Sequence, residues 1–318
     1  MRYSRREFLK TGSVALAYSS AFLGGPKLYA KTLKLPLGLE LYSLRQQLPN
    51  DFNGTLKQVG AIGYREVEAD GYFNHSVAEV KQAMKDAGLK LVSAHYVLDD
   101  LTKQFDEILE FNKELDVAYV ICPTQGFRNP TPGQRTLTLD DWRWNADQFN
   151  ILGERFKAAG IQFGYHNHTE AFRVTDGVVP YDELMRLTDP SKVTMEMDCG
   201  WVVVGGADPV EYLKKYPKRI SMLHVKDFKM AATNPTAPPA APPVSAPTPP
   251  ASGLTPPPRR RSRIAELGQG SIDYAPIFAQ AAKAGHVTHC FVEQEGFDMP
   301  PMDSLKIDAD YVRKLMSA

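Results

Sequence analysis

Residues 160–168 read GIQFGYHNH: a glycine, a short run of β-prone residues, and then a group of polar side chains. The same order recurs at residues 192–199, KVTMEMDC, and at residues 219–227, RISMLHVKD. Each run has the length and the apolar composition of a buried strand, and segments with helical periodicity separate the runs. The pattern therefore predicts βαβ units and a parallel sheet.

Eight such runs occur along the chain, and eight strands close an α/β barrel. Glycines at positions 63, 88, 160 and 285 each end a predicted helix just before a strand, and Ser76 with Glu79 has the spacing of a capping box. We predict strands at residues 35–43, 64–69, 89–95, 117–122, 161–166, 193–198, 219–225 and 288–293. The 318 residues, 43% of them hydrophobic, suffice for one large core. The expected fold is a single-domain (β/α)₈ TIM barrel over residues 31–318.

The first thirty residues are expected to lie outside this barrel. Residues 4–10 read SRREFLK, a weakly apolar stretch follows, and residues 28–30 read LYA. A charged start, a short apolar region and a small final residue are typical of an export peptide, and this one resembles the bacterial twin-arginine signal. We expect cleavage after Ala30 and a periplasmic or otherwise exported protein. A surface arginine pair on an ordinary amphipathic helix is the alternative.

Residues 231–263 interrupt the last βα unit. They consist almost entirely of Pro, Ala, Thr and Ser and end in a basic run, a composition that cannot build a packed core. Without them the last unit has the normal length. We therefore predict a disordered Pro-rich insertion in the loop after strand 7, and because such loops lie at the catalytic face of a barrel, we expect it beside the active-site mouth.

The charge balance argues against nucleic acid as a partner. Lys plus Arg and Asp plus Glu number 37 each, so the chain has no overall cationic field. The three cysteines have no CxxC spacing, which indicates neither a zinc cluster nor a disulfide framework. The expected partners are a small carbohydrate and the twin-arginine export machinery. The sequence leaves assembly into a homo-oligomer open.

Acids and imidazoles at strand ends are the informative residues, because barrel active sites are built from the carboxyl ends of the strands. The last four predicted strands end in or near His166, Asp198, His224 and Glu293. Barrel closure brings such ends together, and a mixed nitrogen and oxygen set suits one divalent ion such as Mn²⁺, Co²⁺, Mg²⁺ or Zn²⁺. The sequence thus predicts a metal centre formed by these four residues.

The chain resembles the xylose isomerase-like barrels, which include sugar phosphate isomerases and epimerases, hydroxypyruvate isomerase and ketose 3-epimerases. The resemblance covers the whole mature chain. The segments that carry it are GLELYSLR (38–45), GYREVE (63–68), YHNH (165–168), GGADP (205–209), HVKDF (224–228) and GQGSID (268–273).

In that family one metal is held by an acid from strand 5, an Asp from strand 6, a His from strand 7 and a Glu from strand 8. Asp198, His224 and Glu293 match this pattern. Strand 5 departs from it, since His166 stands where the epimerases place a glutamate that also exchanges a proton with the substrate. Glu170 is the alternative ligand if the register differs.

The chemistry implied by the resemblance is proton abstraction next to a carbonyl through an enediolate. Glu293 is the candidate base. Lys226 either donates to a substrate oxygen or forms a rim salt bridge with Asp227. His95 either binds a hydroxyl or relays a proton, or else it only orients a neighbouring side chain.

Three further residues complete the candidate substrate-binding set. Glu40 and Glu68 end the first two strands, where they either bind substrate hydroxyls or pair with an arginine such as Arg45. His168 is expected to hold a ligand in orientation.

The leading functional hypothesis is a metal-dependent sugar isomerase or epimerase acting on an unphosphorylated substrate. The histidine on strand 5 makes a second enzyme class credible, a lyase or dehydratase that uses the same carbanion to eliminate a substituent from a 3-keto sugar or keto-inositol. A non-catalytic periplasmic sugar-binding barrel is the third hypothesis.

Overall fold

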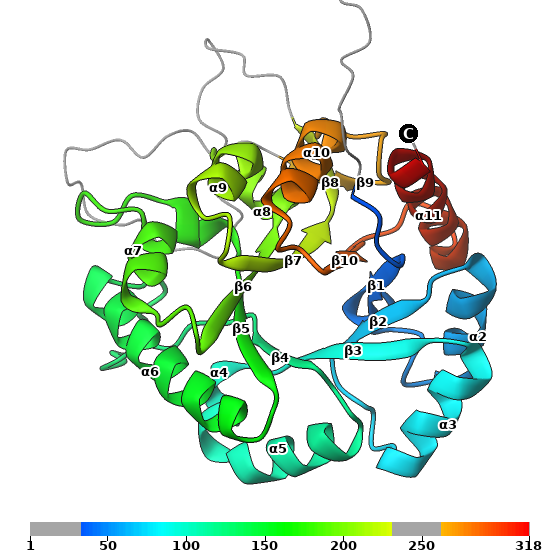
Figure 1. Cartoon of the computed structure of the whole chain (residues 1–318), viewed down its shortest axis with the longest axis horizontal. Coiled ribbons are helices and arrows are strands. Elements are labelled where there is room, and N and C mark those ends of the chain that lie inside the picture. The colour runs from blue at the N-terminus through cyan, green and yellow to red at the C-terminus, as the bar shows by residue number, and fades with distance from the viewer. Residues whose placement is uncertain (1–32, 231–261, 318) are drawn as a thin grey trace, which may run out of the picture. The chain divides into compact units, whose positions relative to one another are not determined.

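Eight parallel strands close into a barrel in the order β1-β10-β7-β6-β5-β4-β3-β2 (Figure 1). The computed structural model describes residues 33–230 and 262–317. The barrel strands are β1 (Gly38–Glu40), β2 (Glu66–Ala69), β3 (Lys90–His95), β4 (Tyr119–Cys122), β5 (Gln162–His166), β6 (Val193–Asp198), β7 (Ile220–Val225) and β10 (His289–Val292). The predicted TIM barrel is confirmed, and each predicted strand contains one of these eight.

Helices surround the barrel and connect its strands (Figure 1). They are α2 (Phe52–Ile62), α3 (Val77–Ala87), α4 (Leu98–Lys103), α5 (Phe105–Glu114), α6 (Leu139–Ala158), α7 (Pro180–Leu187), α8 (Cys199–Val204), α9 (Pro209–Lys215), α10 (Tyr274–Ala284) and α11 (Pro301–Ser317), with short 3₁₀ turns η1 (Leu41–Leu44) and η2 (Thr169–Phe172). The predicted capping box of Ser76 and Glu79 begins α3, and a left-handed Gly88 ends it. In the described part of the chain, no helix has the length and apolar character needed to cross a membrane.

Along the barrel axis, the interior changes from an apolar layer to a polar layer at the carboxyl ends of the strands. Side chains of β3, β4, β7 and β10 form a separate buried cluster of Val92, Ile121, Met222 and Phe291. Met222 lies two residues before His224, and Phe291 two residues before Glu293, so each pair points to the same face of its strand. The apolar cluster therefore forms the layer of the barrel interior next to the polar residues at the carboxyl ends of the strands.

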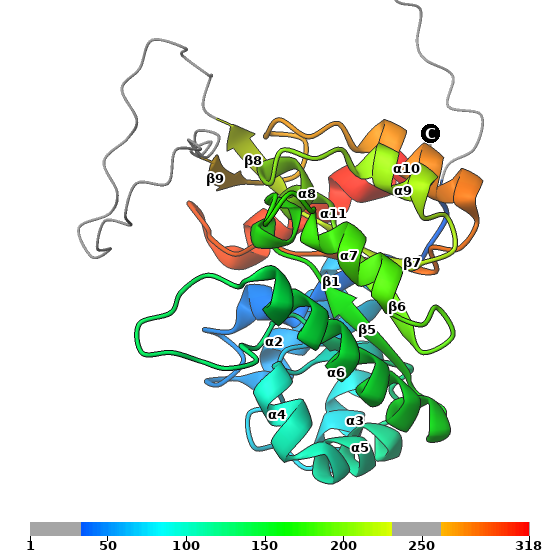
Figure 2. The same cartoon turned by 90° about the vertical axis from the view of Figure 1, so that its left-hand side faces the viewer.

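The predicted insertion is shorter at its C-terminal end than expected. Ser262 and Arg263, assigned above to residues 231–263, begin strand β9 (Ser262–Ala265), which pairs antiparallel with β8 (Asp227–Met230). The pairing supplies the backbone hydrogen bonds that composition alone did not reveal. In Figure 2 this hairpin lies on the same side of the barrel as α8, which follows β6 directly. The rest of the insertion and the predicted signal peptide lie outside the described residues.

Asp308 links α11 to the turn after β9. The residue is 1% exposed, and its Oδ1 accepts the Leu267 N–H at 2.6 Å. Burial raises the pKa of this carboxyl to about 7, although the bond from Leu267 opposes the rise. An unfolded Asp ionises near pH 4, so the free energy of unfolding should decrease as the pH rises from about 4 to about 7.

Asp308→Asn should remove this pH dependence, because the amide keeps an acceptor for Leu267 and cannot ionise. Relative to the unsubstituted protein, we expect the variant's free energy of unfolding to increase by about 2 kcal/mol between pH 5 and pH 8. Urea unfolding at the two pH values measures this difference. The same difference at both pH values would contradict the prediction.

Candidate metal centre

A ring of polar side chains occupies the barrel interior at the carboxyl ends of the strands. Its members come from seven barrel strands or the residue just after one, and all are buried: Glu40, Glu68, His95, His166, Glu196, Asp198, His224 and Glu293. Buried polar groups need partners, and buried charges need compensating charges. The contacts within the ring therefore define what it can bind.

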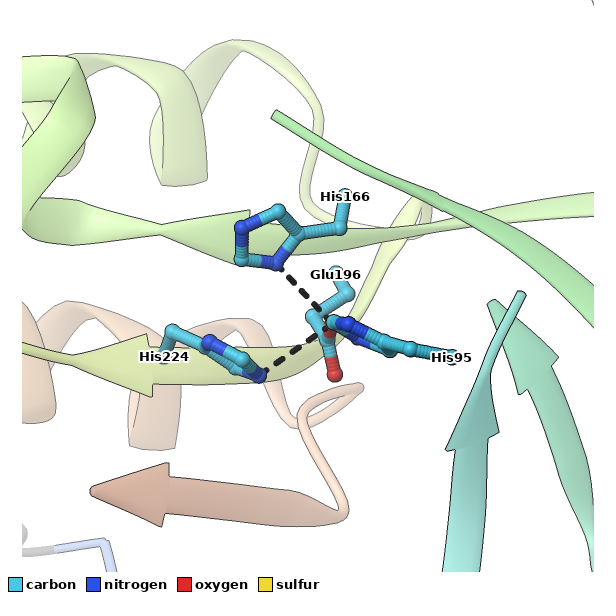
Figure 3. Close-up of side chains that lie close together, drawn as sticks. All are labelled: His95, His166, Glu196 and His224. Atoms are coloured by element: carbon cyan, nitrogen blue, oxygen red, sulfur yellow. Dashed lines mark hydrogen bonds and ion pairs between the residues drawn. The ribbon is translucent and has the colours of Figure 1, made fainter. Parts of the chain in front are cut away.

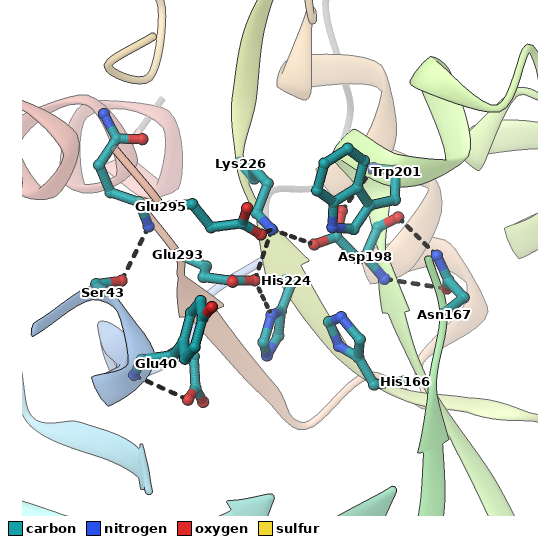
Figure 4. A network of polar contacts seen from close by, with 12 residues as sticks. Glu40, Ser43, His166, Asn167, Asp198, Trp201, His224, Lys226, Glu293 and Glu295 are labelled. Carbon is teal, nitrogen blue, oxygen red and sulfur yellow. Dashed lines mark hydrogen bonds and ion pairs between the residues drawn. The ribbon is translucent and has the colours of Figure 1, made fainter. Parts of the chain in front are cut away.

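The structure brings the four predicted metal ligands together. His166, Asp198, His224 and Glu293 each offer a donor atom, and these atoms all lie within 4.8 Å of one another (Figure 4). Asp198 Oδ2 is buried without a hydrogen bond, and His224 Nδ1 lies 2.9 Å from Glu293 Oε2. Two nitrogen and two oxygen donors this close together fit a divalent transition-metal ion.

The electrostatics of the two histidines differ. Burial lowers the pKa of His166 well below its ordinary value, and neighbouring imidazoles add to the effect, so this ring is neutral with a lone pair to share. Burial would also lower the pKa of His224, but the carboxylates of Glu196, Glu293 and Glu68 outweigh burial and raise it well above the ordinary value. When no metal ion is bound, the His224 ring is therefore protonated and positively charged.

Lys226 is a second cation of the centre, and the predicted rim salt bridge with Asp227 is wrong. The ammonium is fully buried, 2.8 Å from Glu293 Oε2 and 3.2 Å from Asp198 Oδ2, and it also contacts the Glu295 carboxylate (Figure 4). Burial would lower the pKa of Lys226, but these three carboxylates raise it above its ordinary value. The side chain is thus a permanent charge between two proposed ligands.

Asp227 has a structural role instead. Its carboxylate accepts hydrogen bonds from the backbone N–H groups of Phe228, Gly268, Gly270, Ser271 and Ile272. A Cβ at position 270 would collide with this carboxylate, which explains the second glycine of the GQGSID segment. The turn holds the chain just after β7 and so helps to place Lys226.

The deeper part of the ring joins two carboxylates to two imidazoles. Glu196 Oε2 lies 2.8 Å from His95 Nε2 and 3.2 Å from His224 Nε2 (Figure 3). Glu68 Oε1 lies 2.9 Å and 2.7 Å from the same two nitrogens. His95 is therefore held between two carboxylates. The expected pairing of Glu68 with Arg45 is wrong: Glu68 Oε1 contacts the two histidines instead, and its Oε2 is buried without a hydrogen-bond partner.

Arg45 lies further out, where its guanidinium donates to the backbone oxygen of Glu295 at 2.9 Å. The expected pairing of Glu40 with Arg45 is also absent from the contacts of the described residues. Instead, Glu40 accepts the Tyr42 N–H at 3.0 Å and so caps η1. Its other carboxyl oxygen is buried without a hydrogen-bond partner.

Sequence reasoning missed Glu196. Its Oε2 lies 3.0 Å from His166 Nδ1, a contact of the kind that was expected of His168. The alternation of a strand offered a signal, because Glu196 stands two residues before Asp198 and so on the same face. His168 lies with its ring centroid 5.0 Å from that of His166. Glu170 lies in η2 and belongs to none of the donor groups found among the described residues.

Comparison with known proteins gives a consistent family match. A family model described as xylose isomerase-like TIM barrel matches residues 56–315. A solved structure from Parabacteroides distasonis, described as a sugar phosphate isomerase/epimerase, is 30% identical, with a TM-score of 0.64; the match covers 87% of this chain and 97% of that one.

Curated relatives carry a different name. An inosose dehydratase of Clostridium perfringens is 26% identical over 194 residues, which are 57% of this chain and 65% of that protein. The match thus spans less than two thirds of that relative's length. An inosose dehydratase of Clostridium botulinum is 24% identical over 261 residues, which are 77% of this chain and 83% of the relative.

Proposed function

Because the chain belongs to the xylose isomerase-like TIM barrel family, we propose that it is a lyase that eliminates water or another substituent from a keto-inositol or keto sugar. The proposed cofactor is one divalent metal ion held by His166, Asp198, His224 and Glu293. When bound, such an ion would act as a Lewis acid and acidify the carbon next to the substrate carbonyl. The names of the curated relatives support this substrate class.

The observation that carries the proposal is that the centre offers one candidate carboxylate base, Glu293. Asp198 Oδ1 is committed to the Trp201 N–H at 2.7 Å, whereas Glu293 faces Lys226 and His224. On the β5 side, the centre presents the imidazole of His166, whose Nδ1 contacts Glu196. Elimination needs one base that can return its proton, whereas inversion of a carbon centre needs an acid or base on each face.

The chain's own residues can then carry out the reaction. Glu293 removes the proton next to the carbonyl, and the electron pair of that C–H bond forms a C=C bond as the neighbouring hydroxyl leaves. The proton on Glu293 passes to the departing hydroxyl, so the products are an unsaturated ketone and water. Once Glu293 holds the proton, the Lys226 ammonium loses one of its three carboxylate partners and can donate a hydrogen bond to the oxygen on which negative charge develops.

The charge of the centre supports an uncharged substrate. Six carboxyl groups surround one ammonium and three imidazoles; they belong to Glu40, Glu68, Glu196, Asp198, Glu293 and Glu295. A phosphate group would add negative charge beside these acids, at a cost that low dielectric increases. We therefore propose an unphosphorylated polyol as the substrate. We also propose that residues 1–30 direct export of the protein to the periplasm.

An isomerase or epimerase is the second candidate, favoured by the name of the 30% identical structure. Incubating the metal-loaded protein in D₂O with a keto-inositol, a 3-keto glycoside and a free ketose separates the two. We expect a conjugated ketone, seen by ultraviolet absorbance and as vinylic proton signals, and no product after chelation.

A rearranged or inverted ketose carrying deuterium would instead establish the isomerase. Tight sugar binding without turnover under any divalent ion would leave only the sugar-binding barrel.

A further inference from the structure

Glu196 is neither a proposed metal ligand nor the proposed base, yet it contacts more imidazoles than any other carboxylate in the described residues. It is 0% exposed, and its Oε2 lies 2.8 Å from His95 Nε2, 3.0 Å from His166 Nδ1 and 3.2 Å from His224 Nε2 (Figure 3). Two of these three rings are proposed metal ligands. One buried oxygen atom thus touches both of them.

These contacts show which nitrogen of each ring would keep its proton when a metal ion binds the other. A ring nitrogen that donates a hydrogen bond to Glu196 keeps its proton, so the opposite nitrogen is the one available to an ion. His166 then has its proton on Nδ1 and its lone pair on Nε2. With an ion bound, His224 would keep its proton on Nε2, where Glu68 Oε1 is a further acceptor at 2.7 Å, and Nδ1 would be the nitrogen free to bind the ion.

The free nitrogen of His224 points to the proposed centre. Its Nδ1 lies 2.9 Å from Glu293 Oε2. Two ligands bound to one ion at about 2.0–2.2 Å lie about 3 Å apart, so this separation suits neighbouring ligands. Without an ion, the charged His224 ring donates this contact as a hydrogen bond to Glu293, and a bound ion would take the place of that proton.

We propose that Glu196 is a positioning residue that fixes the tautomer and the ring orientation of both histidine ligands at once. The inference rests on the proposed metal centre. A single carboxylate below the ion couples the two ligands, so its loss releases both rings. Outer hydrogen-bond partners of metal-bound histidines typically contribute 10- to 100-fold in metal affinity.

The test is the Zn²⁺ dissociation constant of the full chain, measured by competition with a chromogenic chelator. We expect one ion per chain. For Glu196→Gln we expect a dissociation constant that is 10- to 100-fold larger, which means weaker binding. Glu66→Gln is the matched control, because Glu66 is also a buried barrel carboxylate that contacts an imidazole, His289 Nδ1 at 2.7 Å, but at the opposite end of its strand. Its affinity should equal that of the unsubstituted protein.

A second measurement needs no variant. Long-range ¹H–¹⁵N correlation spectra of the zinc-loaded protein should show His166 protonated at Nδ1 and His224 at Nε2, a signature that a purely structural carboxylate does not require. Either opposite tautomer, or unchanged affinity in Glu196→Gln, would overturn the inference and leave the metal centre standing.

Stoichiometry provides the remaining outcomes. Two ions per chain would also overturn the inference, since His95, His166, Glu196 and His224 would then be ligands of a second ion. No bound ion in the unsubstituted protein would overturn the proposed function and this inference together.

Discussion

Glu293→Gln is expected to lower kcat/KM by about 10³-fold while the barrel stays folded. The amide has nearly the same volume as the carboxylate but cannot accept the substrate proton, and general-base catalysis contributes about 10²- to 10⁴-fold. Lys226 keeps two of its three carboxylate contacts, with Asp198 and Glu295, so the buried ammonium is not left without partners. The measurement is the rate of product formation with metal-saturated protein.

Metal analysis of the same samples separates the two roles proposed for Glu293. Loss of turnover with the ion retained identifies the base, whereas loss of both identifies the ligand. Glu66→Gln controls for the removal of a buried carboxylate elsewhere in the barrel and should keep its activity. A metal-replete Glu293→Gln protein with more than about a tenth of the original rate would rule out Glu293 as the base.

Lys226→Met is expected to reduce the free energy of unfolding of the metal-free protein by about 3–5 kcal/mol. Methionine has a similar length but no charge, so Asp198, Glu293 and Glu295 would face one another without the ammonium that now separates them. Removing one partner of a buried ion pair leaves an uncompensated charge, and here three carboxylates share that partner. Urea unfolding at pH 7 after chelation measures the effect.

The control for this variant is Lys215→Met. Lys215 pairs with Asp182 at 2.8 Å, but its side chain is 53% exposed, so water screens the pair and the expected loss is below about 1 kcal/mol. Equal losses in the two variants would show that burial adds nothing to the contacts of Lys226. A gain in stability on Lys226→Met would show that the desolvation of the ammonium outweighs its attraction to the carboxylates.

The barrel and its strands follow from local patterns alone. Each strand is a short β-prone run after a glycine or a helix end, and parallel strands in one barrel end at one face. The same rule brings His166, Asp198, His224 and Glu293 together from consecutive βα units, without any knowledge of side-chain orientation. Composition likewise indicated where the last unit is interrupted, although the pairing of β9 with β8 shortened that segment.

Contacts across the barrel could not be read in this way, because they join strands that are distant in sequence and depend on rotamers and closure. His95 and Glu196 are 101 residues apart in sequence, yet His95 Nε2 lies 2.8 Å from Glu196 Oε2. Lys226 contacts Glu295, 69 residues away, and not the adjacent Asp227. Alternation places a side chain inside or outside, but only the closed barrel selects its partner. The tertiary structure therefore decides which carboxylates face each histidine ring.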